Sequence, residues 1–274
     1  MTAPLTIRIA ERAVPTPRGR LHAVEWSPAD AAAPARTPLV LLHDSLGCVA
    51  LWRDFPDALA RATGRRVIAY DRLGFGRSDP HPGALPASFI HDEAREGFRH
   101  LRAAFALDRF IAFGHSVGGG MAVGCAAVHP EACEGLVAMS AQAFVEDRTR
   151  QGIRAAREAF ARPGQVERLA KYHGDKARWV LGAWIDTWLA PGFAGWTLDD
   201  DLRRVRCPSL VLHGDCDEYG SALHPRRIAA RVAGPASLHL LEGCGHVPQR
   251  EQPDAVLSKV RHWLAATAAE DAGR

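Results

Sequence analysis

One stretch decides the fold of this chain: Arg109-Phe110-Ile111-Ala112-Phe113-Gly114-His115-Ser116-Val117-Gly118-Gly119-Gly120-Met121-Ala122-Val123. Residues 110–113 are apolar and are followed by a glycine, which is typical of a strand that is buried on both faces. Small residues follow from Val117 onward and favour a helix. The stretch therefore predicts a buried strand, a sharp turn and a helix in immediate succession.

The turn has the pattern G-x-S-x-G, with Ser116 between Gly114 and Gly118. A side chain at either flanking position would collide with the neighbouring strand or helix. Such a turn raises the Ser116 hydroxyl above the sheet and leaves the Val117 amide unpaired, where it can face a developing oxyanion. The pattern also occurs by chance, as a glycine-rich turn with an incidental serine. The strand before it and the helix after it favour a nucleophile elbow.

Further strands and helices alternate on both sides of the elbow. We expect strands at residues 5–11, 21–26, 38–43, 66–70, 134–140, 209–214 and 237–241, and helices at 51–62, 87–107, 224–232 and 253–269. The first two strands are joined by a Pro- and Gly-containing turn, which predicts an antiparallel hairpin. Buried strands alternating with helices favour a mostly parallel sheet that is covered on both faces. In total we expect an α/β fold with about eight strands in one sheet.

The alternation stops in residues 142–205, which show helical patterns and no convincing strand. This segment holds four of the seven tryptophans: Trp179, Trp184, Trp188 and Trp196. A lid over a cleft needs an apolar face of this kind. We therefore predict a core domain of residues 1–141 and 206–274 and a helical lid of residues 142–205, inserted before the strand that ends at Gly214. The alternative is that the tryptophans only hold small helices onto the core.

The composition is that of an ordinary globular protein, with 274 residues, 47% hydrophobic, 24% charged and a net charge of +3. No basic run supports nucleic-acid binding, and no apolar run is long enough to span a bilayer. The N-terminus lacks a basic region followed by an apolar core, so we expect no signal peptide and a cytoplasmic location. The six cysteines have no zinc-ligand spacing. Cys216 and Cys244 are expected to be reduced thiols, with a disulfide between them as the less favoured alternative.

A serine nucleophile needs a base, and the base needs a carboxylate that fixes its tautomer. Asp217 lies in the loop after the strand at 209–214, and His246 lies in the Gly-containing loop after the last strand. The chain order Ser, Asp, His is the one expected for this fold type. Asp215 is an alternative acid, as are Glu146 and Asp147 after the preceding strand, although these two look like lid residues. His213 is expected to be a core residue.

The turn after the strand at 38–43 is expected to supply the second oxyanion donor, because ligands bind at the carboxyl edge of such sheets. We assign this role to the Ser45 amide, and we expect His43 to hold the turn by hydrogen bonding. His115 is expected to point into the fold, away from the side on which Ser116 points. The expected substrate-binding residues are Asp44 and Leu46 of this turn and Trp184 and Trp188 of the lid.

The sequence resembles the α/β-hydrolase-fold family, in its serine hydrolase branch, over nearly the whole chain. The matching segments are Leu41-Leu42-His43 with Gly47, residues 70–78, the elbow at Ser116, Gly214-x-x-Asp217 and Gly245-His246-Val247-Pro248. One departure is His43-Asp44, where the family commonly has His-Gly. This departure affects the oxyanion donor and the charge of the acyl pocket.

The resemblance implies acyl transfer to water by Ser116, His246 and Asp217, without a cofactor or a metal. The leading hypothesis is a carboxylic-ester hydrolase for a small or medium apolar acyl group. The alternatives are a C–C bond hydrolase for ring-cleavage products, in which Arg72, Arg77 or Arg148 would bind the dienoate carboxylate, a thioesterase and an enol-lactone hydrolase. A ligand receptor or a lyase is less favoured. The expected partner is a small-molecule substrate, not a nucleic acid or a membrane, and a homodimer is left open.

Overall fold

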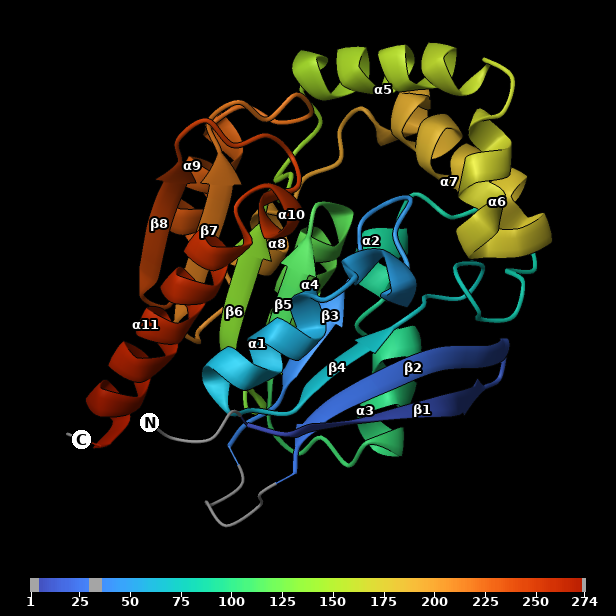
Figure 1. Ribbon diagram of the computed structural model, residues 1–274. Coiled ribbons are helices and arrows are strands. Elements are labelled where there is room, and N and C mark those ends of the chain that lie inside the picture. Colours follow the sequence, from blue (N-terminus) through green and yellow to red (C-terminus); the bar gives the residue numbers. More distant parts are fainter. Residues whose placement is uncertain (1–4, 30–35, 273–274) are drawn as a thin grey trace.

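Strands with apolar side chains on both faces form the centre of the structure. The computed structural model describes residues 5–29 and 36–272, and its sheet has eight strands, as expected (Figure 1). Every residue of β3 (Leu39–Leu42), β4 (Val67–Tyr70), β5 (Phe110–His115) and β7 (Ser209–Gly214) is buried. The other strands are β1 (Ile7–Thr16), β2 (Gly19–Pro28), β6 (Cys133–Met139) and β8 (Ala236–Leu241).

The strand order is β1-β2-β4-β3-β5-β6-β7-β8. The β1–β2 and β2–β4 pairs are antiparallel, which confirms the N-terminal hairpin, and the pairs from β4–β3 to β7–β8 are parallel. The carboxyl ends of parallel strands lie at one edge of a sheet. The turns after β3, β5, β7 and β8 therefore meet at this edge.

Alternating residues of each central strand face two separate parts of the core. Leu39 and Leu41 of β3 pack on one face, beneath α1 (Phe55–Thr63) and α11 (Pro253–Ala272), and Val40 and Leu42 pack on the other. The second face is covered by α3 (Gly97–Ala104), α4 (Val117–Val128) and α9 (Leu223–Arg231) (Figure 1). The sheet is thus covered by helices on both faces, as expected.

Four helices lie between β6 and β7 in the chain: α5 (Asp147–Phe160), α6 (Gln165–His173), α7 (Ala177–Leu189) and α8 (Asp199–Leu202). Short 3-10 turns occur at Gly174–Lys176 and Pro191–Phe193. In Figure 1, α5, α6 and α7 lie beyond the carboxyl ends of the central strands. Within residues 142–205, all of which are described, β-pairing is limited to an isolated bridge between Phe144 and Thr197. The division into core and lid remains a prediction.

The prediction of a single long helix at residues 87–107 is wrong. Two helices occupy this region, α2 (Phe89–Asp92) and α3, with turns between them. In the break, Glu93 turns toward the core, and its Oε1 accepts a hydrogen bond from Tyr70 Oη at 2.6 Å. This long-range contact is absent from the local periodicity on which the prediction depended.

The helix expected at residues 51–62 is also interrupted. A 3-10 turn at Val49–Trp52 precedes α1, and Arg53 between them has φ +53°. Pro56, near the start of α1, is suited to the first helical turn. The surface loop expected at residues 27–37 lies mostly outside the described residues.

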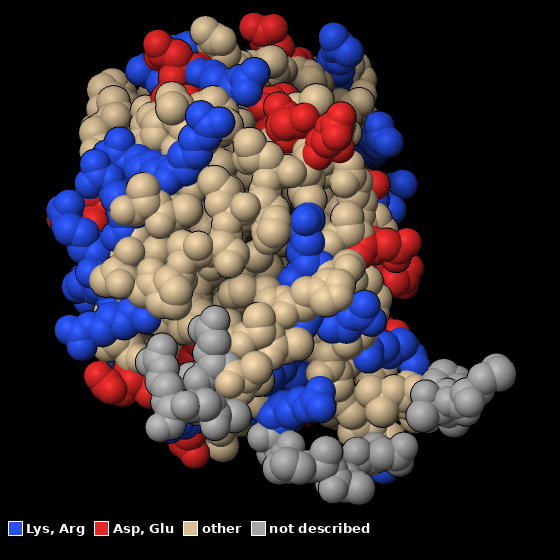
Figure 2. All heavy atoms as spheres, turned by 90° about the vertical axis from the view of Figure 1, so that its left-hand side faces the viewer, with Lys and Arg blue, Asp and Glu red and all other residues tan. Residues whose placement is uncertain are grey.

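The described residues contain no helix with the length and apolar character needed to cross a membrane. Figure 2 shows one face of the molecule, on which blue basic and red acidic side chains surround a central area of uncharged residues. This face therefore carries both signs of charge.

The remaining helix, α10 (Pro248–Glu251), follows the turn that leaves β8.

Candidate active site

Ser116 lies between β5 and α4 with φ +57° and ψ −124°, a conformation that side chains rarely adopt. A Cβ atom at Gly114 would lie 1.9 Å from the Gly118 carbonyl oxygen. A Cβ atom at Gly118 would lie 2.1 Å from the Leu42 carbonyl oxygen of the neighbouring strand. Both glycines are therefore required for the tight packing that presents the serine at the sheet edge.

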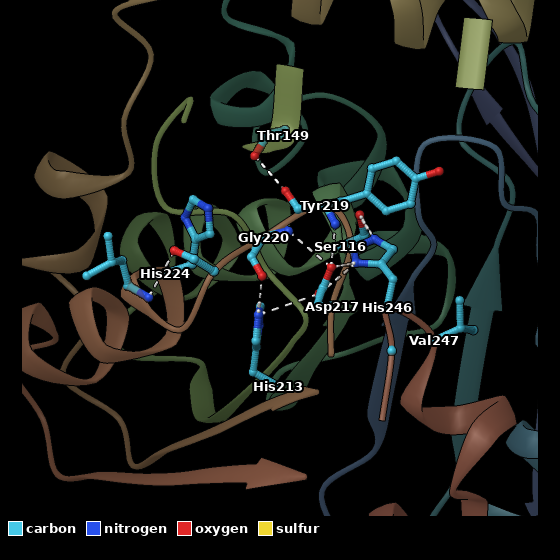
Figure 3. Close-up of polar contacts among 12 residues, drawn as sticks. Ser116, Thr149, His213, Asp217, Tyr219, Gly220, His224, His246 and Val247 are labelled. Atoms are coloured by element: carbon cyan, nitrogen blue, oxygen red, sulfur yellow. Dashed lines mark hydrogen bonds and ion pairs between the residues drawn. The ribbon is translucent and has the colours of Figure 1, made fainter. Parts of the chain in front are cut away.

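Three side chains from separate loops form a hydrogen-bonded series (Figure 3). His246 Nε2 lies 2.9 Å from Ser116 Oγ, and His246 Nδ1 lies 2.9 and 2.8 Å from the two carboxylate oxygens of Asp217. Because the carboxylate can only accept, Nδ1 carries the proton and Nε2 is free to accept the serine hydroxyl proton. The structure thus brings together the three residues that the sequence predicted as catalytic.

The Asp217 carboxylate is completely buried and oriented by the backbone. Its Oδ1 accepts the N–H groups of Tyr219 and Gly220 at 2.8 and 3.0 Å (Figure 3). Burial alone would raise the pKa of Asp217, but the hydrogen bond and charge of His246, together with the backbone donors, lower it. Burial likewise opposes the charged form of His246, but the bond to Asp217 and its negative charge raise the pKa of this imidazole. The ring is therefore held as a stronger base than a free histidine.

The loops that carry Asp217 and His246 pack directly on each other. Cys216 N–H donates to the Cys244 carbonyl at 2.9 Å, and a Cβ atom at Gly214 would lie 2.2 Å from the same carbonyl. Both cysteines have free thiols in the structure.

The alternative acids lie elsewhere. Asp215 is exposed, and the Glu146 carboxylate binds His224 Nε2 at 2.9 Å and the hydroxyl of Ser221 at 2.9 Å. His213 is buried, and its Nε2 donates to the Gly220 carbonyl at 3.0 Å. It supports the loop that follows Asp217, as Figure 3 shows.

A cavity of about 240 Å³ opens beside Ser116 and His246. The four predicted substrate-binding residues, Asp44, Leu46, Trp184 and Trp188, all line it, and so does Ser45. Two other tryptophans are not among its lining residues. Trp179 stacks on His81, and Trp196 stacks on Phe193.

The sequence reasoning missed several lining residues. They include Thr149 and Ile153 of α5, together with Gln142, Tyr219, Gln249 and Arg250. The Tyr219 ring packs edge-on against His246, with ring centroids 4.9 Å apart. Because Tyr219 lies two residues after Asp217, its sequence position could have indicated that it is near the site. No local pattern distinguishes Thr149. Its hydroxyl donates to the Tyr219 carbonyl at 2.6 Å (Figure 3).

His115 is buried, as expected, but it also lines the cavity. Its Nε2 donates to the His246 carbonyl at 2.8 Å, and its Nδ1 lies 3.4 Å from Asp44 Oδ2. Burial would raise the pKa of Asp44, but the neighbouring His115 and His43 rings and the Leu46 amide outweigh burial and hold it below its usual range. The cavity therefore contains a carboxylate at the position where the resemblance leads one to expect glycine.

Among the described residues, no cluster of three or more His, Cys, Asp or Glu side chains has the arrangement of a metal site. The side chains of Ser116, His246 and Asp217 are arranged for nucleophilic attack by Ser116 with proton transfer through His246.

Comparison with known proteins identifies the fold. The family described as alpha/beta hydrolase fold matches residues 37–163. The rat (Rattus norvegicus) 1-acylglycerol-3-phosphate O-acyltransferase ABHD5 is 34% identical over 113 residues, which are 41% of this chain and 31% of that protein. This match thus spans about a third of the relative's length. Proline iminopeptidase of Lactobacillus helveticus is 24% identical over 271 residues, covering 84% of this chain and 90% of that protein.

Solved structures match over a larger part of the chain. Carboxylesterase CesB of Bacillus subtilis has a TM-score of 0.70 and 21% identity, covering 95% of this chain and 93% of that one. The 2-hydroxy-6-oxo-6-phenylhexa-2,4-dienoate hydrolase of Rhodococcus sp. strain RHA1 has a TM-score of 0.73 and 21% identity, covering 95% of this chain and 100% of that one. At this identity the likeness shows the fold alone.

Proposed function

This chain has the α/β-hydrolase fold, and on that basis we propose that it is a serine hydrolase that cleaves carboxylic esters through an acyl-enzyme. The observation that carries the proposal is the series Asp217–His246–Ser116, which ends beside a cavity whose lining includes apolar and aromatic residues. Such a series has the geometry needed to activate a hydroxyl. The relatives named as an acyltransferase and a peptidase support acyl-transfer chemistry.

In the first half-reaction, Ser116 Oγ attacks the ester carbonyl carbon while His246 Nε2 accepts the hydroxyl proton. The carbonyl oxygen becomes an oxyanion, for which the Ser45 and Val117 amides are the proposed donors. Collapse of the tetrahedral intermediate releases the alcohol, which takes the proton from His246. The product is an acyl group on Ser116.

In the second half-reaction, His246 removes a proton from water, which attacks the acyl-enzyme carbonyl. The second tetrahedral intermediate collapses, Ser116 regains its proton from His246, and the carboxylic acid leaves. Asp217 keeps its negative charge throughout and stabilises the transient imidazolium. The reaction consumes one water molecule for each ester that is cleaved.

The cavity supports a substrate of small or medium size. Its volume of about 240 Å³ leaves room for a short acyl or aryl group beside Ser116. Leu46, Leu51, Ile153, Trp184 and Trp188 supply an apolar lining. An apolar acyl group of a few carbons is therefore the favoured substrate component.

The C–C hydrolase alternative needs a cation for the dienoate carboxylate. Arg77 instead binds Glu11 at 2.8 Å on the surface, Arg148 is not among the residues that line the cavity, and Arg72 Nη2 donates to the Asp44 carbonyl. These positions do not place the three expected arginines in this cavity. Arg250 does line it, so the dienoate is kept as the second candidate in the test below. Thioesters and enol lactones would follow the same acyl-enzyme route, so substrate profiling has to separate them.

The test is hydrolysis of p-nitrophenyl esters with acyl chains of two to twelve carbons, compared with a dienoate ring-cleavage product and a matched thioester. We expect the highest kcat/KM on a short-chain ester and covalent labelling of Ser116 by a fluorophosphonate. Ser116→Ala is expected to abolish both. Full turnover by folded Ser116→Ala would refute the proposal, and unlabelled wild-type protein that still binds a ligand would favour a receptor.

A further inference from the structure

The carbonyl oxygen of Asp44 is held by two side chains. His43 Nδ1 lies 2.8 Å from this oxygen, and Arg72 Nη2 donates to it at 2.9 Å. The backbone N–H of Gly47 lies 3.2 Å from the same atom. This carbonyl therefore has a fixed direction in the turn after β3.

The donor role of His43 follows from its second nitrogen. His43 Nε2 accepts the backbone N–H of Arg72 at 3.2 Å, so the proton of the neutral ring is on Nδ1 and is donated to Asp44. Burial lowers the pKa of His43 to about 3. The ring thus stays neutral, and the same hydrogen bonds persist, over the pH range in which His246 would act.

The direction of the Asp44 carbonyl determines the direction of the Ser45 amide. The two groups belong to one trans peptide, in which C=O and N–H point to opposite sides. Because Arg72 and His43 hold the oxygen on one side, the Ser45 N–H points to the other. Ser45 lines the cavity that contains Ser116, and it also lines an adjoining void of about 10 Å³ together with Val117 and Arg72.

The two proposed oxyanion donors are also available. Among the hydrogen bonds of residues 5–29 and 36–272, none uses the backbone N–H of Ser45 or of Val117. Unpaired amides on two residues that line one void, one of which follows Ser116 in the chain, are suited to an anionic oxygen.

Arg72 is an unusual residue for a purely structural position. Its side chain is buried with 4% exposure, its guanidinium lies 4.2 Å over the Phe75 ring, and its Nε has no partner among the described residues. Its side-chain hydrogen bond is to a neutral carbonyl. The charges of Glu93 and Asp44 act on it from a distance, but it forms no ion pair among the described residues, although a buried charge normally has one to offset desolvation. The positive charge therefore lies, at an energetic cost, on the peptide that carries the Ser45 amide.

We infer that Arg72 is a positioning residue for the oxyanion hole: together with His43 it fixes the Asp44–Ser45 peptide so that the Ser45 N–H faces the reacting carbonyl. Its charge also polarises this peptide and strengthens the amide as a donor. The inference rests on the proposed function, because it assigns a role within the acyl-transfer step. It gives Arg72 no contact with the substrate.

The test compares Arg72→Met, which keeps an unbranched apolar stem but removes the donors and the charge, with Arg72→Lys, which keeps the charge. Arg77→Met, on the same loop but bound to Glu11 on the surface, is the matched control. The readouts are kcat and KM for p-nitrophenyl butyrate and the inhibition constant of butylboronic acid, whose adduct with Ser116 mimics the tetrahedral intermediate. Circular dichroism and thermal unfolding check that each variant is folded.

For Arg72→Met we expect kcat to fall by about 10- to 100-fold and KM to change by less than about 3-fold, since the loss of a whole donor costs ~10²–10³. The boronate inhibition constant is expected to rise by the same factor by which kcat/KM falls. Arg72→Lys is expected to lie between wild type and Arg72→Met, and Arg77→Met to match wild type. A purely structural role would lower the folded fraction without this parallel loss of boronate affinity.

Folded Arg72→Met with wild-type boronate affinity would overturn the inference and leave the proposed function intact. If Arg72→Met does not fold, unchanged boronate affinity in Arg72→Lys would overturn the inference in the same way. Wild-type protein that forms no Ser116-dependent boronate adduct would overturn the proposed function and this inference together.

Discussion

Both carboxylate oxygens of Asp217 lie within hydrogen-bonding distance of His246 Nδ1, at 2.9 and 2.8 Å. The carboxylate is buried, and it is held in place by two backbone donors from the residues that follow it. The orientation and the negative charge of Asp217 are therefore fixed before any substrate binds. The pKa of His246, and with it the pH dependence of the proposed reaction, should therefore depend on the contact with Asp217.

Asp217→Asn is expected to move the acidic limb of the pH–rate profile to lower pH. In wild type the charge and hydrogen bond of Asp217 raise the pKa of His246 above its ordinary value of 6.5, against the effect of burial. His246 must be neutral to act as a base, so kcat/KM should rise with pH through this raised pKa. Without the carboxylate the pKa falls, and kcat/KM at its plateau falls by about 10²–10⁴.

The measurement is kcat/KM for p-nitrophenyl butyrate between pH 5 and pH 9, recorded at a wavelength that is insensitive to p-nitrophenol ionisation. Asp215→Asn, on the exposed part of the same loop, is the control and should leave the limb in place. An unshifted limb in Asp217→Asn would contradict the assignment of His246 as the titrating base.

Gly118→Ala is expected to destabilise the protein strongly, because the new Cβ atom would meet the backbone of β3 at 2.1 Å. Gly124→Ala, six residues further along α4, is the matched control. Its Cβ atom would have an ordinary contact of 3.6 Å with the Ile90 carbonyl, so it should gain helix propensity of up to about 1 kcal/mol. Urea unfolding followed by circular dichroism compares the two, and equal midpoints would contradict the steric explanation of the elbow.

Local signals explain why so much of this arrangement was predictable. The glycines around Ser116 are sequence features that reflect backbone collisions, as the contacts at Gly114 and Gly118 show. Gly243, before His246, has φ +64°, a conformation that favours glycine. The parallel strand order then brings the loops to one edge. Fold class and the convergence of three side chains could therefore be predicted, whereas their catalytic role remains a prediction.

Long-range contacts explain what was missed. Glu93 leaves the helical pattern to bind Tyr70, and nothing within residues 87–107 indicates that partner. Thr149 reaches the site from α5 through the Tyr219 carbonyl, which is 70 residues away in sequence. Trp184 and Trp188 line the cavity while Trp179 does not, although all three lie on α7. The face of a helix that meets a cavity depends on packing that periodicity alone does not determine.

Asp44→Asn is expected to change the charge preference of the cavity without disturbing its turn. The asparagine oxygen can still accept the Leu46 amide, as Asp44 Oδ1 does at 2.9 Å. Removing the carboxylate should raise kcat/KM for the anionic p-nitrophenyl hemisuccinate relative to p-nitrophenyl butyrate by roughly 3- to 10-fold, because a repulsive charge within a few ångströms is lost. The ratio of the two constants is the measurement. A ratio equal to that of wild type would show that the Asp44 charge does not reach the acyl group.

Glu93 makes the stability of this protein depend on pH in the direction opposite to that of a salt-bridged carboxylate. Burial raises the pKa of Glu93 from 4.5 to about 7, although the Tyr70 hydrogen bond and the charge of Arg72 act against this shift. The folded state therefore binds a proton that the unfolded state releases at lower pH. The stability that this group contributes is fully present below pH 4.5 and is lost as the pH rises to about 7.

Glu93→Gln stays uncharged at every pH, and its amide oxygen can accept the Tyr70 hydroxyl. We expect it to match wild type at pH 4 and to exceed it at pH 8 by about 1–3 kcal/mol in the free energy of unfolding, since each pKa unit is worth about 1.4 kcal/mol and solvent screening reduces the full effect. Urea titrations at pH 4, 6 and 8 measure this difference. Glu96→Gln, which removes a surface carboxylate bound to Arg18, is the control and should stay within about 0.5 kcal/mol of wild type. A Glu93→Gln difference that does not change with pH would show that the buried proton is absent.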